Sequence, residues 1–317
     1  MSRAFLFPGQ GSQAVGMGRA LAEAFPAARE VFEEVDDALG QRLSTLMAEG
    51  PEGELILTEN AQPALMAVSI AALRVLMKEG GFRLVDKAAC VAGHSLGEYS
   101  ALCAAGAFSL ADTARLLKRR GQAMQRAVPV GEGAMAALLG LDLDGAEAVV
   151  ATAREGGART EVLGVANDNA PGQVVVSGHK AAVERAIAAA AEKGARRSVL
   201  LPVSAPFHCA LMAPAADAMA EALANSVIQM PAVPVVANVT ASGVSDVDTI
   251  RRLLVEQVTC MVRWRESVLY MKSSGVEQLV EVGAGKVLTG LVKRIDRDLA
   301  GAAAGTPEEI EALLKTL

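Results

Sequence analysis

The sequence predicts a mixed α/β fold with a small inserted module, and two observations support this interpretation. Along the first 130 residues, short apolar runs of strand length alternate with longer segments of helical periodicity, which is typical of an α/β protein. From residue 131 the expected order changes to strand, helix, strand, strand, helix, strand, which is the order of a ferredoxin-like module. We therefore expect a large α/β subdomain that is interrupted by a small ferredoxin-like subdomain.

The first part of the large subdomain covers residues 1–130. A helix over residues 15–39 is expected to break at Pro26, because proline cannot continue the backbone hydrogen bonds of a helix. A short apolar strand over residues 88–92 is followed by an alanine-rich helix. In order, the expected elements are strand 4–7, helices 15–39 and 63–79, strand 88–92, and helices 98–105 and 110–126.

The small subdomain covers residues 131–200, and the second part of the large subdomain covers residues 201–317. Valine, proline, valine and glycine at residues 128–131 predict a hinge between the two units. A cleft between the units is expected to hold a ligand. The expected elements of the insert are strand 135–139, helix 145–154, strands 162–166 and 174–177, helix 181–193, and strand 198–201.

Composition favours a cytoplasmic enzyme. A chain of 317 residues that is 52% hydrophobic can bury a substantial core. The net charge of -6 argues against nucleic acid as the main partner. The cysteines are far apart and lack metal-ligand spacing, so we expect reduced core residues and a cytoplasmic location. These cysteines are Cys90, Cys103, Cys209 and Cys260.

No targeting or membrane segment is expected. The apolar stretch over residues 4–7 is too short for a signal peptide. The most apolar helix, near residues 61–77, is interrupted by Gln62, Pro63 and Arg74.

Residues 93–97 form a G-x-S-x-G motif between an expected strand and an expected helix. This is the setting of a nucleophile elbow, because the flanking glycines allow a strained turn that exposes the serine hydroxyl. Ser95 is therefore the candidate nucleophile. The alternative is an ordinary turn of glycine and serine, since the motif alone is common.

The candidate base is one of three histidines. His94 adjoins the serine and is expected to point away from it, while His179 is expected in a solvated loop. His208 follows a proline and a phenylalanine and precedes a helical run, which is where open α/β sheets gather their sites. We therefore favour His208 as the base that takes the proton of Ser95. The alternative is a histidine that only begins a helix.

Two further patterns are compatible with a site. Residues 7–13 end the first strand with two glycines and two glutamines, which permit close backbone approach and offer amide donors. They could also be a simple turn, and they lack the spacing of a dinucleotide-binding fingerprint. Arg120 lies in the basic cluster 118–120 of an expected helix, where a solvated surface arginine is the common alternative.

Taken together, these motifs resemble malonyl-CoA:acyl carrier protein transacylases of bacterial fatty acid synthesis, which are similar to the acyltransferase domains of polyketide synthases. The resemblance covers nearly the whole chain. Ala284 is a departure, because such proteins usually carry proline there, and we expect no effect on the chemistry. The motifs lie at residues 7–13, 93–99, 120–121, 167 with 171–174, 207–212 and 281–288.

The resemblance implies an α/β-hydrolase-like large subdomain with the ferredoxin-like insert. It implies that Ser95 is acylated and that His208 is its base. The backbone N–H groups of Gln10 and Leu96 would form the oxyanion hole. Arg120 would bind the free malonyl carboxylate, because a guanidinium offers two parallel hydrogen bonds to a carboxylate.

The resemblance also assigns supporting residues. The backbone carbonyl of Gln257 would orient the base, and Gln62 and His94 would line the pocket. The bulk of Leu96 and Phe207 would disfavour a methylmalonyl group. No metal, nicotinamide or flavin cofactor is implied. The implied partners are malonyl-CoA and acyl carrier protein, with no nucleic acid or membrane, and the expected state is a monomer.

The expected activity is a two-step transfer of malonate from malonyl-CoA to the phosphopantetheine thiol of acyl carrier protein through a malonyl-serine, which supplies fatty acid synthesis. Three alternatives stay open. A serine hydrolase or thioesterase shares the G-x-S-x-G motif, although the His-Gly-Gly-Gly oxyanion motif is missing from the sequence. A malonyl transferase could serve polyketide synthesis instead. A non-catalytic module could only bind the carrier protein.

Overall fold

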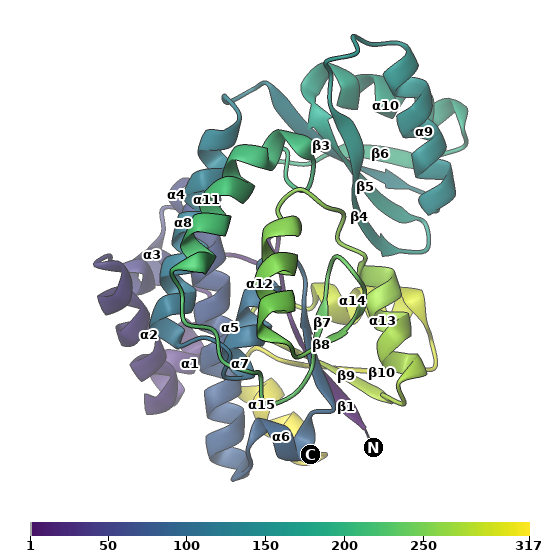
Figure 1. Cartoon of the computed structure of the whole chain (residues 1–317). Helices are drawn as coiled ribbons and strands as arrows, with labels where there is room; N and C mark the ends of the chain where they lie inside the picture. Colours follow the sequence, from purple (N-terminus) through teal and green to yellow (C-terminus); the bar gives the residue numbers. More distant parts are fainter. Residues whose placement is uncertain (1) are drawn as a thin grey trace.

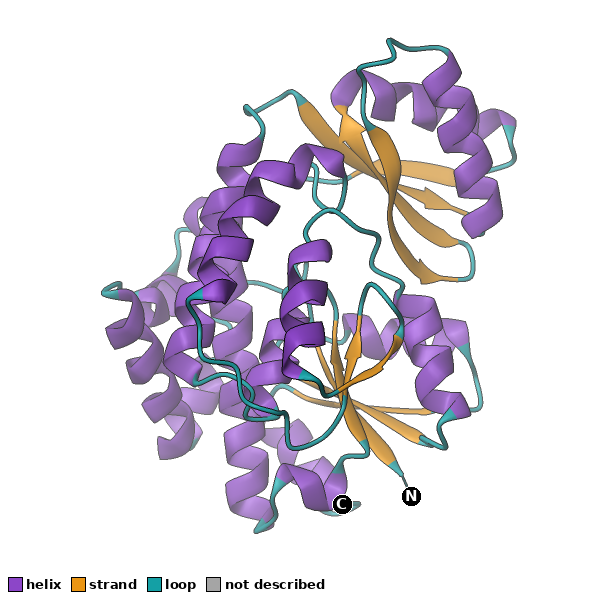
Figure 2. Cartoon of the chain, viewed as in Figure 1, coloured by secondary structure: helices purple, strands orange, loops and turns teal. Residues whose placement is uncertain are grey.

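Two β-sheets organise the chain, and the structure, a computed structural model, describes residues 2–317 (Figures 1 and 2). The larger sheet has the strand order β10-β9-β1-β2-β7-β8. All neighbouring strands in it are parallel except β7 and β8, which are antiparallel. Its strands are β1 (Arg3–Phe7), β2 (Cys90–Gly93), β7 (Val235–Ala237), β8 (Ser242–Val244), β9 (Gln278–Val282) and β10 (Ala300–Ala304).

Helices cover both faces of this sheet because its strands are apolar on both sides. Along β1, Phe5 and Phe7 face one core cluster, while Ala4 and Leu6 face another. This alternation follows from the two-residue period of a strand. The first cluster packs under α5 (Thr58–Gly80), α7 (Gly97–Ala104) and α8 (Leu110–Ala127), and the second packs under α13 (Trp264–Ser273) and α14 (Val287–Ile295).

The remaining helices of the large region are mostly short, and each contributes buried residues to the first core cluster (Figure 1). The predicted helix over residues 15–39 is two helices that meet at Pro26, where the break was expected. These two are α1 (Arg19–Ala24) and α2 (Pro26–Leu39), and α11 (Ala213–Ala224) lies in the helical run that was expected after His208. The others were not predicted, and they are α3 (Leu43–Glu49), α4 (Glu52–Leu55), α6 (Leu84–Lys87), η1 (Ala210–Met212), α12 (Val247–Glu256) and α15 (Pro307–Leu314).

The smaller sheet has the antiparallel order β4-β5-β3-β6, which is the ferredoxin-like arrangement. Its elements are β3 (Gly133–Leu139), α9 (Leu143–Glu155), β4 (Leu163–Ala170), β5 (Gln173–His179), α10 (Lys180–Glu192) and β6 (Arg197–Leu200). The predicted boundaries at residues 131 and 200 enclose all of these elements. The mixed α/β fold with an inserted ferredoxin-like unit is therefore confirmed.

The two faces of the smaller sheet have different neighbours. Ala136 and Leu138 of β3 pack with α9 and α10 in a separate core cluster. Met135 and Ala137, which point the other way, belong to the core cluster of the large region. The smaller sheet therefore turns one face toward the large region, and that face carries residues of the site described below.

Helix α5 is the one helix among the described residues that is both long and apolar enough to cross a membrane. By length and composition it could cross a membrane, but 89% of its most apolar window is buried inside the fold, as in the core helix of a globular protein. It begins at Thr58, earlier than the predicted start at residue 63. The additional turn places Gln62 on the helix, where its amide donates a hydrogen bond of 2.8 Å to the Thr58 hydroxyl.

Candidate active site

Ser95 lies at a sharp turn between β2 and α7. Its φ of 53° is in the left-handed region, which a residue with a side chain rarely adopts. The glycines on either side are required for space: a Cβ on Gly93 would lie 1.9 Å from the carbonyl carbon of Gly97, and one on Gly97 would lie 2.2 Å from the carbonyl oxygen of Phe7. The predicted nucleophile elbow is therefore present.

His208 meets the serine from the segment between β6 and η1. Its Nε2 atom lies 2.7 Å from the Ser95 hydroxyl oxygen. Its Nδ1 atom lies 2.9 Å from the backbone carbonyl oxygen of Gln257. Because a carbonyl only accepts hydrogen bonds, Nδ1 carries the proton and Nε2 is left to accept one from Ser95. The geometry is that of a nucleophile, a base and an orienting carbonyl.

The electrostatics of the pair keep His208 neutral. Burial, and after it the positive charge of Arg120, lower the pKa of His208 from 6.5 to about 3, while the hydrogen bond to the Gln257 backbone opposes the shift. A neutral imidazole at physiological pH can receive the serine proton.

Arg120 is a buried cation beside the serine. It projects from α8, is 1% exposed, and donates from one Nη atom to the Ser95 hydroxyl oxygen at 3.2 Å. It also donates to the side-chain oxygens of Gln62 and Gln257, each at 2.8 Å. Within residues 2–317 it forms no ion pair with a carboxylate. Burial lowers the pKa of Arg120, and the nearby Tyr99 and Glu98 oppose that shift.

One cavity of about 260 Å³ brings the predicted site residues together. Every predicted site residue lines it except Gln257, which lies behind its wall and reaches it through hydrogen bonds to the base and the cation. The predicted residues in the lining are Gln10, Gln62, His94, Ser95, Leu96, Arg120, Phe207 and His208, and the others are Gly11, Gln13, Met124, Met135, Asn167, Leu201, Pro202 and Val203.

Comparison with known proteins identifies the family. Residues 4–308 match the model of the acyl transferase domain. The malonyl CoA-acyl carrier protein transacylase of Escherichia coli strain K12 is 50% identical over 312 residues, which are 98% of each chain. This chain belongs to the acyl transferase family. The resemblance that the sequence motifs indicated is thus confirmed.

Solved structures of such acyl transferases share the fold. An acyl-carrier-protein S-malonyltransferase from Bartonella henselae superposes with a TM-score of 0.96 at 56% identity, covering 100% of this chain and 99% of its own. A malonyl-transacylase in complex with a type II polyketide synthase acyl carrier protein gives a TM-score of 0.95 at 43% identity and covers both chains fully.

In this acyl transferase the elbow histidine has a role distinct from the base. The Nε2 atom of His94 lies 2.8 Å from the side-chain oxygen of Asn169 on β4, and its ring lies 5.5 Å from that of Trp264. Burial lowers the pKa of His94, while the hydrogen bond to Asn169 opposes the shift. A neutral His94 thus lines the cavity without contacting the serine hydroxyl.

The prediction for His179 was wrong. It is the last residue of β5 and not part of a solvated loop, and its Nδ1 accepts a hydrogen bond of 2.8 Å from the backbone N–H of Val162. The strand pairing of β4 with β5 holds it there, which the polar composition of the segment did not reveal.

Sequence reasoning missed two buried residues beside the elbow. Asn238 follows β7 and accepts a hydrogen bond of 2.7 Å from the backbone N–H of Ser95. Glu98 lies in the first turn of α7 and accepts from the side chain of Gln257 at 2.8 Å. The apolar run of β7, residues 235–237, was the available signal for Asn238, because the carboxyl ends of parallel strands gather polar site residues.

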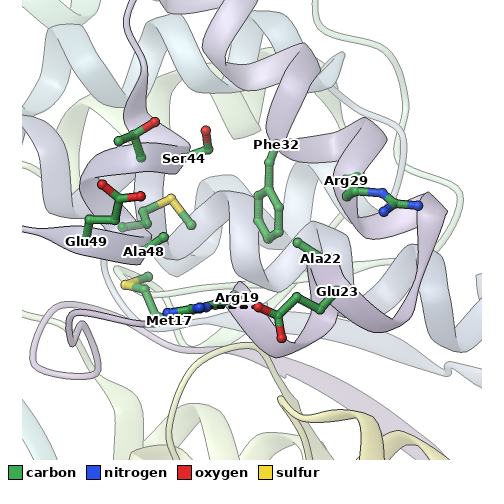
Figure 3. A pocket seen from close by; sticks show the side chains of 12 residues that line it. Met17, Arg19, Ala22, Glu23, Arg29, Phe32, Ser44, Ala48 and Glu49 are labelled. Carbon is green, nitrogen blue, oxygen red and sulfur yellow. Dashed lines mark hydrogen bonds and ion pairs between the residues drawn. The ribbon is translucent and has the colours of Figure 1, made fainter.

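A separate hollow of about 330 Å³ lies among α1, α2 and α3 (Figure 3). None of the predicted site residues lines it. The Arg19–Glu23 pair at its edge is solvent-exposed and contributes little free energy. Within residues 2–317, no group of three or more histidine, cysteine, aspartate or glutamate side chains is placed to hold a metal ion.

Proposed function

We propose that this acyl transferase moves a malonyl group from malonyl-CoA to the phosphopantetheine thiol of an acyl carrier protein. The observation that carries the proposal is the buried guanidinium of Arg120, 3.2 Å from the Ser95 hydroxyl oxygen and without a carboxylate partner among residues 2–317. A desolvated cation beside a nucleophile favours an acyl group that brings its own carboxylate.

The first half-reaction acylates the serine. The Nε2 atom of His208 takes the proton of Ser95 as the serine oxygen attacks the thioester carbonyl carbon. The carbon–sulfur bond then breaks, and the CoA sulfur leaves with the proton from His208. Malonyl-serine and CoA are the products, so atoms and charge balance.

The second half-reaction reverses these steps with a different thiol. The phosphopantetheine thiol gives its proton to His208 and attacks the malonyl-serine ester, after which Ser95 leaves with that proton. Since one thioester is exchanged for another, the net driving force is small and ping-pong kinetics are expected.

The oxyanion formed in each half-reaction needs two donors. We assign this role to the backbone N–H groups of Gln10 and Leu96, which both belong to residues that line the cavity. Leu96 directly follows the nucleophile, as elbow chemistry requires. Neither N–H group has a hydrogen-bond acceptor among residues 2–317, which leaves both available to the oxyanion.

Selectivity among dicarboxylic acyl groups is assigned to bulk beside the dyad. Leu96 and Phe207 both line the cavity and are nearly fully buried. Their volume would crowd the α-methyl of a methylmalonyl group. Because one methyl group is worth only about 1 to 3 kcal/mol, this discrimination is weaker than selection by charge.

The relatives described above support the choice of partners, since one is named a transacylase of malonyl CoA and acyl carrier protein and another was solved with such a carrier protein. We assign the product to fatty acid synthesis. A polyketide carrier is the second candidate, because the solved complex contains one. Transfer rates to a carrier of each pathway decide between them.

The proposed chemistry uses only side chains and backbone groups of the chain, so we propose that it needs no metal, nicotinamide or flavin. We also propose a cytoplasmic monomer without a nucleic acid or membrane partner. The net charge of -6 and four free cysteines support these assignments.

The test is a product analysis with malonyl-CoA and a phosphopantetheinylated carrier protein. Malonyl-carrier is the expected product, with little free malonate. Rapid release of free malonate would show that the protein is a hydrolase. Unchanged malonyl-CoA would show that the protein is not a transferase and would favour a non-catalytic module that binds the carrier protein.

A further inference from the structure

Glu98 is a buried carboxyl group to which the proposed mechanism gives no role. It is 3% exposed and lies in the first turn of α7. Its Oε2 atom accepts two hydrogen bonds, one of 2.9 Å from the backbone N–H of Asn238 and one of 2.8 Å from the side-chain amide of Gln257. Burying a carboxyl group is costly unless such bonds are made, so both donors matter to its position.

One of these two donors, Gln257, contacts three functional groups. Its backbone carbonyl oxygen accepts from Nδ1 of His208 at 2.9 Å. Its side-chain oxygen accepts from Arg120 at 2.8 Å, and its side-chain nitrogen also donates to the backbone carbonyl of Ser95 at 3.0 Å. The amide plane of one buried glutamine therefore sets the position of the cation and ties it to the elbow.

The second donor, Asn238, spans the strained turn itself. Its side-chain oxygen accepts from the backbone N–H of Ser95 at 2.7 Å, and its side-chain nitrogen donates to the backbone carbonyl of Gly93 at 2.7 Å. Such a strained backbone persists only where its surroundings hold it. Asn238 supplies those surroundings, and Glu98 holds Asn238 by its backbone.

We propose that Glu98 is a positioning residue: through Gln257 and Asn238 it holds the nucleophile, the base and the cation in one arrangement. Glu98 does not line the cavity, and its hydrogen-bond partners in the described chain are Asn238 and Gln257 and not the side chains of Ser95 or His208. The inference rests on the proposed function only for the role of Arg120, which is to bind the malonyl carboxylate. The effect of Glu98 on Ser95 and His208 holds for any acyl group.

The role of Glu98 depends on its acceptor oxygen more than on its charge. Burial raises the pKa of Glu98 to about 7, against the opposing effects of its two hydrogen bonds and of Arg120. A neutral side chain with an oxygen at the same point can still accept both bonds. Glutamine supplies that oxygen at the right distance, whereas aspartate keeps the charge and withdraws the oxygen by one methylene.

Two conservative variants therefore separate geometry from charge. The readout is the rate at which a fluorophosphonate labels Ser95, because this needs the nucleophile and its base but no malonyl group. Glu98→Asp should slow labelling by about a hundredfold, the cost of a small misplacement of reacting groups. Glu98→Gln should stay within about fivefold of wild type, since a neutral acceptor replaces a charged one.

A second readout reports the cation. In Glu98→Asp the ratio of kcat/KM for malonyl-CoA to that for acetyl-CoA should fall about tenfold, because Gln257 no longer holds Arg120 firmly. Glu98→Gln should keep the ratio of the wild type. If the fluorophosphonate reacts with Ser95 of the wild-type protein but malonyl-CoA does not acylate it, the proposed function is wrong. The labelling test of Glu98 stays valid in that case.

Glu281 provides a matched control. It is also a fully buried glutamate, and it accepts from the backbone N–H groups of Leu288 at 3.0 Å and Thr289 at 2.7 Å, outside the cavity. Glu281→Asp should lower the Tm and leave the labelling rate of Ser95 unchanged. The proposal is overturned if Glu98→Asp labels at the wild-type rate, if it labels faster than Glu98→Gln, or if Glu281→Asp is slowed equally.

Discussion

The two sheet regions contribute to one cavity in different ways. The large region supplies the nucleophile on an elbow and the cation on a long helix, Ser95 and Arg120, and holds both through the buried Gln257. The small region supplies Met135 and Asn167, whose side chains line the same cavity but, in the described part of the chain, form no hydrogen bond with Ser95 or His208. The groups to which we assign the chemistry therefore lie in the region that is built on the mostly parallel sheet.

Charge is also used differently in the two regions. The large region buries Arg120, where an unpaired cation is costly and, in the proposed function, pairs with the malonyl carboxylate. The small region exposes Arg196 and Arg197, which form no ion pair within residues 2–317. Lys118 and Arg119 of the large region, by contrast, are paired with Glu59 and Glu221. Of these four cations, the two without an ion pair therefore lie on the small region, where they could meet an acidic carrier protein.

The largest effect is expected from loss of the base. His208→Ala removes the proton acceptor of Ser95 and should lower the rate of serine acylation by about 10² to 10⁴-fold, the usual range for a general base. Rapid-mix acylation with malonyl-CoA measures this rate. A change of less than about threefold would exclude His208 as the base.

The next effect is on the choice of acyl group. Arg120→Ala should lose most malonyl transfer and lower the malonyl-to-acetyl ratio of kcat/KM by about a hundredfold or more, because an unpaired buried cation costs about 3 kcal/mol or more. Arg120→Lys should recover only part of the ratio, since an ammonium lacks the paired donors of a guanidinium. An unchanged ratio in Arg120→Ala would contradict the assigned role.

A smaller effect should come from the small region. Reversing Arg196 and Arg197 to glutamate should raise KM for the carrier protein several-fold and spare KM for malonyl-CoA, because both side chains are exposed and unpaired. Arg119→Glu serves as the control, since that arginine is already paired with Glu221. Equal effects on both substrates would argue against docking on this face.

The smallest expected effect is on how the free energy of unfolding depends on pH. The pKa of His208 is about 3 in the fold and 6.5 in an unfolded chain, so its contribution weakens the fold as pH falls below about 6.5. The pKa of Glu98 is about 7 in the fold and 4.5 in an unfolded chain, so its contribution strengthens the fold as pH falls below about 7. The two contributions oppose each other in the wild type.

Each contribution can be removed on its own. When the pH is lowered from about 7.5 to about 5.5, the free energy of unfolding of His208→Gln should rise relative to that of wild type by about 1 to 2 kcal/mol. For Glu98→Gln it should fall relative to wild type by about the same amount. Denaturant unfolding at both pH values measures the difference. Shifts of the same sign in both variants would contradict the two pKa directions.

The sequence predicted those parts of the site that depend on local pattern. The elbow at Ser95 follows from glycine spacing between a strand and a helix, and the inserted module follows from the order of its elements. The base was found by elimination among three histidines together with the family motif. Its prediction agrees with the 2.7 Å contact of His208 with Ser95.

The parts that depend on distant pairing could not be predicted. Asn238 and Glu98 become site neighbours only because β7 pairs with β2, which brings residues 140 positions apart into hydrogen-bond contact. No strand was assigned after residue 201, since β7 and β8 are short and lack a clear period. Burial of Arg120 could likewise not be predicted, because the two residues before it, Lys118 and Arg119, are basic, as on a solvated helix surface.

The central claim is that Ser95 carries a malonyl group between two thiols. The direct measurement is peptide mapping by mass spectrometry after the protein is mixed with malonyl-CoA in the absence of carrier protein, with Ser95→Ala as the control. The account predicts one malonyl group on Ser95, removed when a phosphopantetheinylated carrier protein is added, and none on Ser95→Ala. A malonyl group on another residue, with turnover retained in Ser95→Ala, would contradict it.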